Sequence, residues 1–309
     1  MTTPEIILHQ YDTSPFSEKI RLIFGLKNIN WRAVDIPVIM PKPDLMPLTG
    51  GYRRTPVMQI GADIYCDTQV IIRELERRFP TPTLFPAGNK GVMWSVGMWT
   101  DRPFFQASVA VIFGGIGDAV PEDFIKDREQ LSGSPFNVDA MKAAVPMMRD
   151  HWRAYAGWIE EQLDDGRTWL MGDSPGLADI STFMDVWFLK NGFPPAADLL
   201  NEFGRVNAWA ERVAGLGHGN RTDMTSADAV EIAKNATSTT ETKLDPLDPN
   251  GRKPGDRVSV SPDDYGRTSV VGELVASSAQ EIAIKRTDER VGEIVVHFPR
   301  AGFLVAPAE

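Results

Sequence analysis

Three short stretches of the chain carry hydroxyl or acidic side chains that could bind or activate a small polar ligand. Ser14-Pro15 reads as the start of a helix, because Ser is a preferred N-cap residue and Pro fits the first helical position. Arg54-Thr55-Pro56 directly precedes an apolar run. Cys66-Asp67-Thr68 leads into a second predicted helix, whose N-terminus favours anions. Taken singly, the three stretches are also explained as two helix caps and a plain trans turn.

The sequence does not support other kinds of site. The histidines His9, His151, His218 and His297 are far apart, and with a single cysteine they do not form a zinc-site pattern, so no metal is expected. No phosphate-binding or dinucleotide glycine pattern occurs. The run Gly-Gly-Ile-Gly at residues 114–117 lacks the required spacing, and we expect it to be a loop.

The composition is that of an ordinary globular protein with two or three domains. The chain has 309 residues, of which 42% are hydrophobic and 24% charged. Its formal net charge of -10 argues against nucleic acid and anionic membranes as partners. No apolar run reaches the ~18 residues that a membrane helix needs. Because Cys66 is the only cysteine, no intrachain disulfide can form, and we expect a cytoplasmic protein.

Hydrophobic periodicity predicts the order strand, helix, strand, strand, strand, helix in the first part of the chain. We expect strands at 5–8, 31–36, 57–60 and 64–66, with helices from Ser14 and over 68–79. Residues 37–48 contain four prolines and cannot form a regular helix through their middle. A simple doubly wound domain would alternate strands and helices more regularly.

Changes in composition divide the rest of the chain. A stretch rich in Pro and Gly marks a boundary near residue 86, and residues 87–236 are predicted to be helical. Residues 237–253 are polar and read as a linker, so few contacts are expected to cross it. Residues 254–309 alternate short apolar runs with turn signals, which predicts about five strands closing into a small SH3-like barrel.

The first 85 residues resemble the thioredoxin-like domain of the glutathione S-transferases, because the three stretches occur in that family's order and spacing. The resemblance extends to about residue 236, since residues 172–180 are similar to the segment before the central helix of the family's helical domain. Gly176 stands where the family has Ser or Thr. The implied fold is an α/β thioredoxin-like domain at 1–86 and an all-α domain at 87–236. The linker at 237–253 and the small all-β module at 254–309, of unknown role, lie outside the family's ordinary fold.

The resemblance implies which residues would contact glutathione. In this family a Cys, Ser or Tyr near the first stretch activates the thiol, which implies Ser14, with Tyr11 and Ser17 as alternatives. A cis peptide bond before Pro56 would let the backbone of Thr55 pair with the cysteinyl part of glutathione as an added strand does.

The second part of that ligand would lie at the third stretch. The resemblance implies that Asp67 takes the ammonium of the γ-glutamyl end, while Thr68 and the helix amides take its carboxylate. Arg54 is grouped with these binding residues. Large apolar residues early in the helical domain could line a pocket for the electrophile, although such side chains are more often core: Trp94, Met98 and the candidates Trp99, Phe104 and Phe105.

The resemblance thus implies an enzyme that uses glutathione as co-substrate against small hydrophobic electrophiles, as in detoxification. Isomerase, peroxidase and reductive dehalogenase activities use the same activated thiol and are not separated by the sequence. The alternative is a non-catalytic glutathione-binding or regulatory protein, since the extra module would suit interaction with a partner of its own. The resemblance also implies a homodimer.

Overall fold

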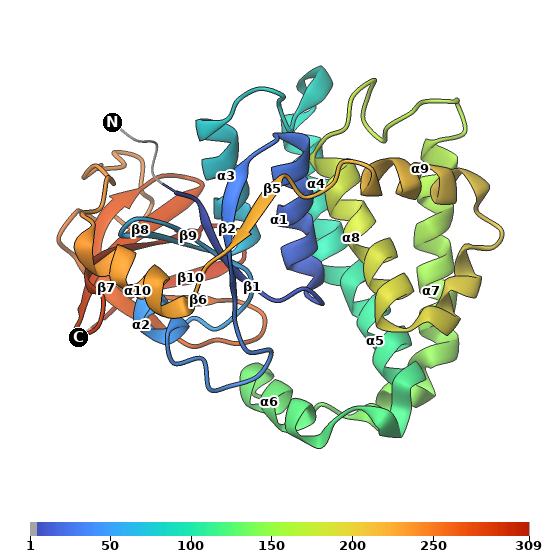
Figure 1. The fold of residues 1–309 in the computed structure, drawn as a ribbon, viewed down its shortest axis with the longest axis horizontal. Coiled ribbons are helices and arrows are strands. Elements are labelled where there is room, and N and C mark those ends of the chain that lie inside the picture. The colour runs from blue at the N-terminus through green and yellow to red at the C-terminus, as the bar shows by residue number, and fades with distance from the viewer. Residues whose placement is uncertain (1–4, 309) are drawn as a thin grey trace.

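The structure is a computed structural model that describes residues 5–308 (Figure 1). The thioredoxin-like domain consists of β1 (Ile7–Gln10), α1 (Pro15–Leu26), β2 (Asn30–Asp35), α2 (Leu45–Thr49), β3 (Val57–Ile60), β4 (Asp63–Cys66) and α3 (Thr68–Arg78). β1 pairs in parallel with β2 and antiparallel with β3, and β3 pairs antiparallel with β4. The predicted order of elements is confirmed, with the short α2 added inside the proline-rich segment.

The middle of the chain is helical, as predicted. It contains α4 (Lys90–Trp99), a π-helical turn (Thr100–Phe104), α5 (Phe105–Ile116), α6 (Glu122–Ser132), α7 (Val138–Gln162), α8 (Leu177–Gly192) and α9 (Gly204–Ala214). Asp179 holds the start of the buried α8, where its carboxylate accepts a hydrogen bond of 3.0 Å from the N–H of Gly176. A Cβ at Gly176 would stand 2.8 Å from Pro86, so close packing explains the missing Ser or Thr.

The prediction of a loop at residues 114–117 was wrong, because residues 114–116 form the end of α5. A Cβ at Gly114 would stand 2.5 Å from the side chain of Val145 on α7, and one at Gly115 would stand 2.4 Å from the Phe193 ring. The glycines therefore allow neighbouring elements to pack closely against α5. A glycine-rich run, which is typical of a loop, here marks the point where a helix contacts its neighbours.

The C-terminal strands form a small all-β module, as predicted. They are β6 (Arg257–Pro262), β7 (Val270–Ser277), β8 (Glu281–Asp288), β9 (Gly292–Pro299) and β10 (Phe303–Pro307). Each pairs antiparallel with the next from β6 to β9, and β10 returns to pair with β6. Before them lie β5 (Asn220–Asp223), an unpredicted strand parallel to β2, and α10 (Ser226–Asn235).

The module is joined edge to edge with the thioredoxin-like sheet. β9 pairs in parallel with β4, which gives one ten-stranded sheet of order β10-β6-β7-β8-β9-β4-β3-β1-β2-β5. Figure 1 shows the C-terminal strands on one side of the thioredoxin-like domain and α5, α7 and α8 on the other. The expectation that few contacts would cross to residues 254–309 was wrong. The domain boundaries themselves stay predictions.

A buried polar cluster fastens the module and the start of the segment 237–253 to β4. The Asp63 carboxylate accepts hydrogen bonds of 2.9 Å from Thr239 N–H and from the Thr240 hydroxyl, and His297 Nδ1 lies 2.6 Å from Glu281 Oε1. Burial disfavours the charged imidazole, but hydrogen bonds to Asp63 and Glu281 outweigh it and raise the pKa of His297 to about 9. Burial is likewise outweighed at Asp63, whose pKa is held well below its usual value by hydrogen bonds from His297 and neighbouring hydroxyls.

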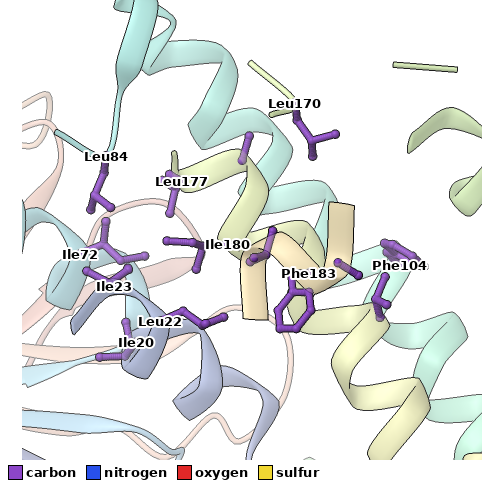
Figure 2. Close-up of a cluster of buried hydrophobic side chains, with 14 of the residues drawn as sticks. Ile20, Leu22, Ile23, Ile72, Leu84, Phe104, Leu170, Leu177, Ile180 and Phe183 are labelled. Carbon is purple, nitrogen blue, oxygen red and sulfur yellow. The ribbon is translucent and has the colours of Figure 1, made fainter. Parts of the chain in front are cut away.

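Two hydrophobic cores lie on opposite faces of the central sheet. Leu8 and Met58 belong to one, whereas their chain neighbours Ile7 and Val57 belong to the other, as strand alternation requires. The first core lies between the sheet, α1, α3 and the helical domain, and Figure 2 shows side chains of α1, α3 and α8 meeting in it. The second core joins the sheet to α2, α10 and the C-terminal strands.

Candidate functional site

Ser14 is the N-cap of α1, as its sequence pattern predicts. Its Oγ accepts a hydrogen bond of 3.1 Å from the backbone N–H of Ser17, and Pro15 takes the first helical position. The residue is almost fully buried. Because Oγ acts as the acceptor in this bond, the hydroxyl of Ser14 can donate its proton to another group, and the Tyr11 phenol is within hydrogen-bonding reach.

The two alternative hydroxyls lie close to Ser14 in the chain but have different surroundings. The carbonyl of Tyr11 accepts a hydrogen bond of 3.0 Å from Ser14 N–H, so these residues share one turn. Burial raises the pKa of the Tyr11 phenol, while Arg128 and a hydrogen bond with Ser14 act in the opposite direction. Ser17 is fully buried, and its Oγ has no hydrogen-bond partner within residues 5–308. The structure thus brings Tyr11 and Ser14 together.

The peptide bond between Thr55 and Pro56 is cis, as the resemblance implies. β3 begins at the next residue, Val57. Neither the N–H nor the C=O of Thr55 has a hydrogen-bond partner in the part of the chain that the structure describes. Backbone groups left unpaired at the start of a strand can pair with an extended peptide ligand.

Asp67 and Thr68 stand at the N-terminus of α3, directly after β4. Asp67 has a φ of 91°, which is rare for a residue with a side chain, and its carboxylate accepts a hydrogen bond of 2.9 Å from Gln69 N–H. Burial raises the pKa of Asp67 to about 6, and the hydrogen bond from Gln69 opposes this rise. Asp67 is therefore the cap of α3 and also one of the two residues predicted to bind the amino-acid end of glutathione.

Arg54 contacts the C-terminal module, which the sequence did not indicate. Its guanidinium lies 3.9 Å from the centre of the Tyr265 ring. It also donates hydrogen bonds to the Tyr265 carbonyl and to the Asp264 carboxylate. The charge of Arg54 is thus already paired with an acid from a segment about two hundred residues away in the chain.

Two adjoining hollows open at the N-terminus of α3. The larger has a volume of about 160 Å³ and reaches Lys19, Arg73 and Trp94. The smaller has a volume of about 50 Å³ and is lined by residues of all three parts of the chain. The lining residues common to both are Thr68, Gln69, Met98 and Asp101. The smaller hollow is further lined by Phe16, Arg54, Asp67, Arg102, Asp264, Tyr265, Gly302 and Phe303.

The three aromatic candidates for an electrophile pocket line neither of these hollows. Phe104 is fully buried, and Trp99 stacks on it with ring centres 5.1 Å apart. Phe105 packs against Phe16 at 4.8 Å and Phe188 at 5.7 Å. Of the wider set considered from the sequence, Trp94 lines the larger hollow and Met98 lines both.

A group of charged residues near Tyr11 was missed by the sequence analysis. The Lys42 Nζ lies 5.7 Å from the centre of the Tyr11 ring and 3.4 Å from the Thr55 hydroxyl. Burial, reinforced by Arg128 and opposed by Asp127, lowers the pKa of Lys42 to about 8. In the sequence, Lys42 is marked only by its place between two prolines. Nothing in the sequence around α6 indicates that this helix lies close to the first domain.

Comparison with known proteins agrees with the fold described above. A family model described as the N-terminal domain of glutathione S-transferase matches residues 8–83. A second model, described as a domain of unknown function, matches residues 119–218. The crystal structure of a GST-like protein from Pseudomonas syringae is 39% identical, covers 99% of this chain and 100% of its own, and superposes with a TM-score of 0.83.

The chain belongs to the glutathione S-transferase family. Maleylacetoacetate isomerase from Pseudomonas aeruginosa is 26% identical over 185 residues, which is 56% of this chain and 76% of that protein. A glutathione S-transferase from Rhodospirillum rubrum shares the fold at 18% identity, with a TM-score of 0.52 over 67% of this chain and 87% of its own. Within residues 5–308, no helix is long and apolar enough to cross a membrane. The same residues contain no group of three or more His, Cys, Asp or Glu side chains that could hold a metal ion.

Proposed function

We propose that this protein is a glutathione-dependent enzyme that activates the glutathione thiol for attack on small hydrophobic electrophiles. The observation that carries the proposal is the unpaired backbone of Thr55 just before β3, which lies across the sheet from Asp67 and Thr68 at the start of α3. The unpaired N–H and C=O of Thr55 can pair with a peptide, and the helix start offers an acid and a hydroxyl for an amino-acid end. The family to which the chain belongs supports glutathione as that peptide.

The Ser14 hydroxyl is the proposed donor to the thiolate sulfur. Pro15 has no backbone N–H to offer the sulfur, so the Ser14 side chain is the natural donor at this point of the helix start. Tyr11 lies beside Ser14 and is the next candidate, followed by Ser17. The cations Lys42 and Arg128 near this turn would favour the thiolate over the thiol, because opposite charge stabilises the ionised form.

Isomerisation is a second candidate reaction, favoured by the likeness to maleylacetoacetate isomerase. In such a reaction the thiolate adds to one carbon of an electrophilic double bond, the resulting single bond rotates, and elimination returns the thiolate and the isomerised alkene. The same activated sulfur serves addition and elimination, so the chain needs no group beyond those named for transfer.

Two further expectations belong to this proposal. We propose a cytoplasmic protein, which the single buried cysteine suits. We also propose a homodimer by analogy with the family, and light scattering that gives about 34 kDa at micromolar protein would contradict it. Any such dimer must leave β4 aside as a pairing edge, because β3 and β9 occupy both of its sides.

The test is a glutathione titration followed by a screen of electrophiles and electrophilic alkenes. Calorimetric binding together with glutathione-dependent turnover would support the enzyme. Binding without turnover of any substrate would favour the non-catalytic alternative, a glutathione-binding or regulatory protein. No binding at millimolar glutathione would refute both.

A further inference from the structure

We propose that the C-terminal module forms one wall of the glutathione site, and that Tyr265 is a positioning residue that holds Arg54 against the amino-acid end of the ligand. The inference rests on the proposed function. It assigns a role to residues that lie outside the part of the chain resembling ordinary transferases.

The sheet topology brings the module to the site. Because β9 runs parallel to β4, both strands end at the same edge of the sheet. The loop after β4 begins with Asp67, and the turn after β9 spans residues 300–302. β6 ends opposite the start of β10, with Pro262 paired to Phe303, so the loop 263–266 lies beside that turn. Two module loops are therefore placed next to the start of α3.

Contacts on both flanks of the smaller hollow hold these loops in place. On one flank, the Gln69 amide donates a hydrogen bond of 3.1 Å to the Ala301 carbonyl. On the other, Arg102 of the helical domain forms an ion pair of 2.7 Å with Asp263. Between these two flanks, Arg54 donates hydrogen bonds to the Asp264 carboxylate and to the Tyr265 carbonyl. The module thus touches both other domains around the same opening.

Glycine stands at two positions where these loops approach the rest of the chain. Gly266 has a φ of +60°, and a Cβ there would stand 2.8 Å from the Leu131 side chain of α6. Gly302 has a φ of +85°, and its Cβ would stand 3.0 Å from the guanidinium of Arg102. The left-handed backbone at both positions favours glycine, and the tips of Leu131 and Arg102 would have to move to admit a larger residue.

Tyr265 gives Arg54 a fixed position. A guanidinium held over an aromatic ring keeps its planar donors in one orientation, and the Asp264 carboxylate restrains it further. Arg54 lines the hollow together with Asp67 and Thr68, where the proposal places the charged amino-acid end of glutathione. Removing the ring would leave Arg54 held only by Asp264 and by the backbone carbonyl of residue 265, and it would open this wall.

The experiment measures glutathione affinity by calorimetry in full-length wild type, Tyr265→Ala, Tyr265→Phe and Glu293→Gln. Tyr265→Ala should weaken binding roughly three- to thirtyfold, the range of a partly buried cation–aromatic contact. Tyr265→Phe keeps the ring and should stay within about twofold of wild type. Glu293→Gln is the matched control, because this side chain is 65% exposed on β9 and lines neither hollow.

Hydrogen exchange of the wild type supplies a second measurement that needs no variant. Bound glutathione should slow amide exchange in the loops 263–266 and 300–302. If glutathione binds while both loops exchange at unchanged rates, or if Tyr265→Ala binds as well as or better than wild type, the wall assignment is overturned and the proposed function stands. If wild type takes up no glutathione at all, the proposed function fails first, and the inference built on it fails with it.

Discussion

Replacing Ser14 by Ala separates the two roles that the structure allows this hydroxyl. As a cap, Ser14 accepts the 3.1 Å hydrogen bond from Ser17 N–H, and losing such a cap costs about 1 kcal/mol of folding free energy. As a donor to a thiolate, the same hydroxyl would contribute ~1.5–3 kcal/mol, so Ser14→Ala should lower the rate constant roughly ten- to a hundredfold. It should also raise the thiol pKa of bound glutathione, with little change in glutathione affinity.

The control is Thr225→Ala, since Thr225 caps α10 through a hydrogen bond of 3.1 Å from Asp228 N–H and lines neither hollow. It should show a comparable loss of stability without any change in rate. Ultraviolet titration of the bound thiolate, run beside thermal melts, measures both effects. If Ser14→Ala behaves as Thr225→Ala does, with rate and thiol pKa intact, the donor assignment is refuted, and Tyr11→Phe becomes the next test.

Three further outcomes are expected. Asp67→Ala should weaken glutathione binding roughly ten- to a hundredfold by calorimetry. Because the pKa of Asp67 is raised to about 6, the affinity of the wild type should improve as the pH rises through that value, and the variant should show no such improvement. Lys42→Met should raise the thiol pKa of bound glutathione, and an unchanged ultraviolet titration would count against a role for Lys42. The His297 pKa of about 9 lies above its ordinary 6.5, so its contribution of at most roughly 3 kcal/mol is complete below pH 6.5 and lost as the pH rises through about 9. The melting temperature of wild type, but not of His297→Gln, should fall across that interval.

The features that the sequence predicted are those set by neighbours in the chain. A cap such as Ser14 is defined by its own helix, and the same holds for Asp67 at α3. The element order of the first domain follows from local periodicity. The cis bond at Pro56 was implied by family resemblance and is present, although the tripeptide alone would have favoured a trans turn.

The features that were missed depend on contacts between distant segments. Nothing local to Arg54 indicates that Asp264 and Tyr265 will bind it. The pairing of β9 with β4 did leave a signal, because residues 294–296 are consecutive apolar residues and β9 is buried on both faces. A continuous apolar run is typical of an interior strand, whereas an exposed barrel strand would alternate. Weighting that run would have placed β9 inside a larger sheet and the module against the first domain.

The charges around the candidate site favour one orientation of the bound ligand. Near Ser14 and Thr55 the titratable groups are mainly cationic, with Lys42 and Arg128 close to Tyr11. At the start of α3, the smaller hollow is lined by carboxylates and guanidinium groups together, and Arg54 is ion-paired with Asp264 there. A thiolate is favoured near Ser14, because Lys42 and Arg128 are cations. The amino-acid end of glutathione, which carries an ammonium and a carboxylate, is favoured at the smaller hollow, because its lining carries charges of both signs. Glutathione carries its ammonium and its thiol in different residues, so this polarity supports one orientation of the peptide. The module takes part in this arrangement, since Asp264 and Tyr265 hold Arg54 at the smaller hollow.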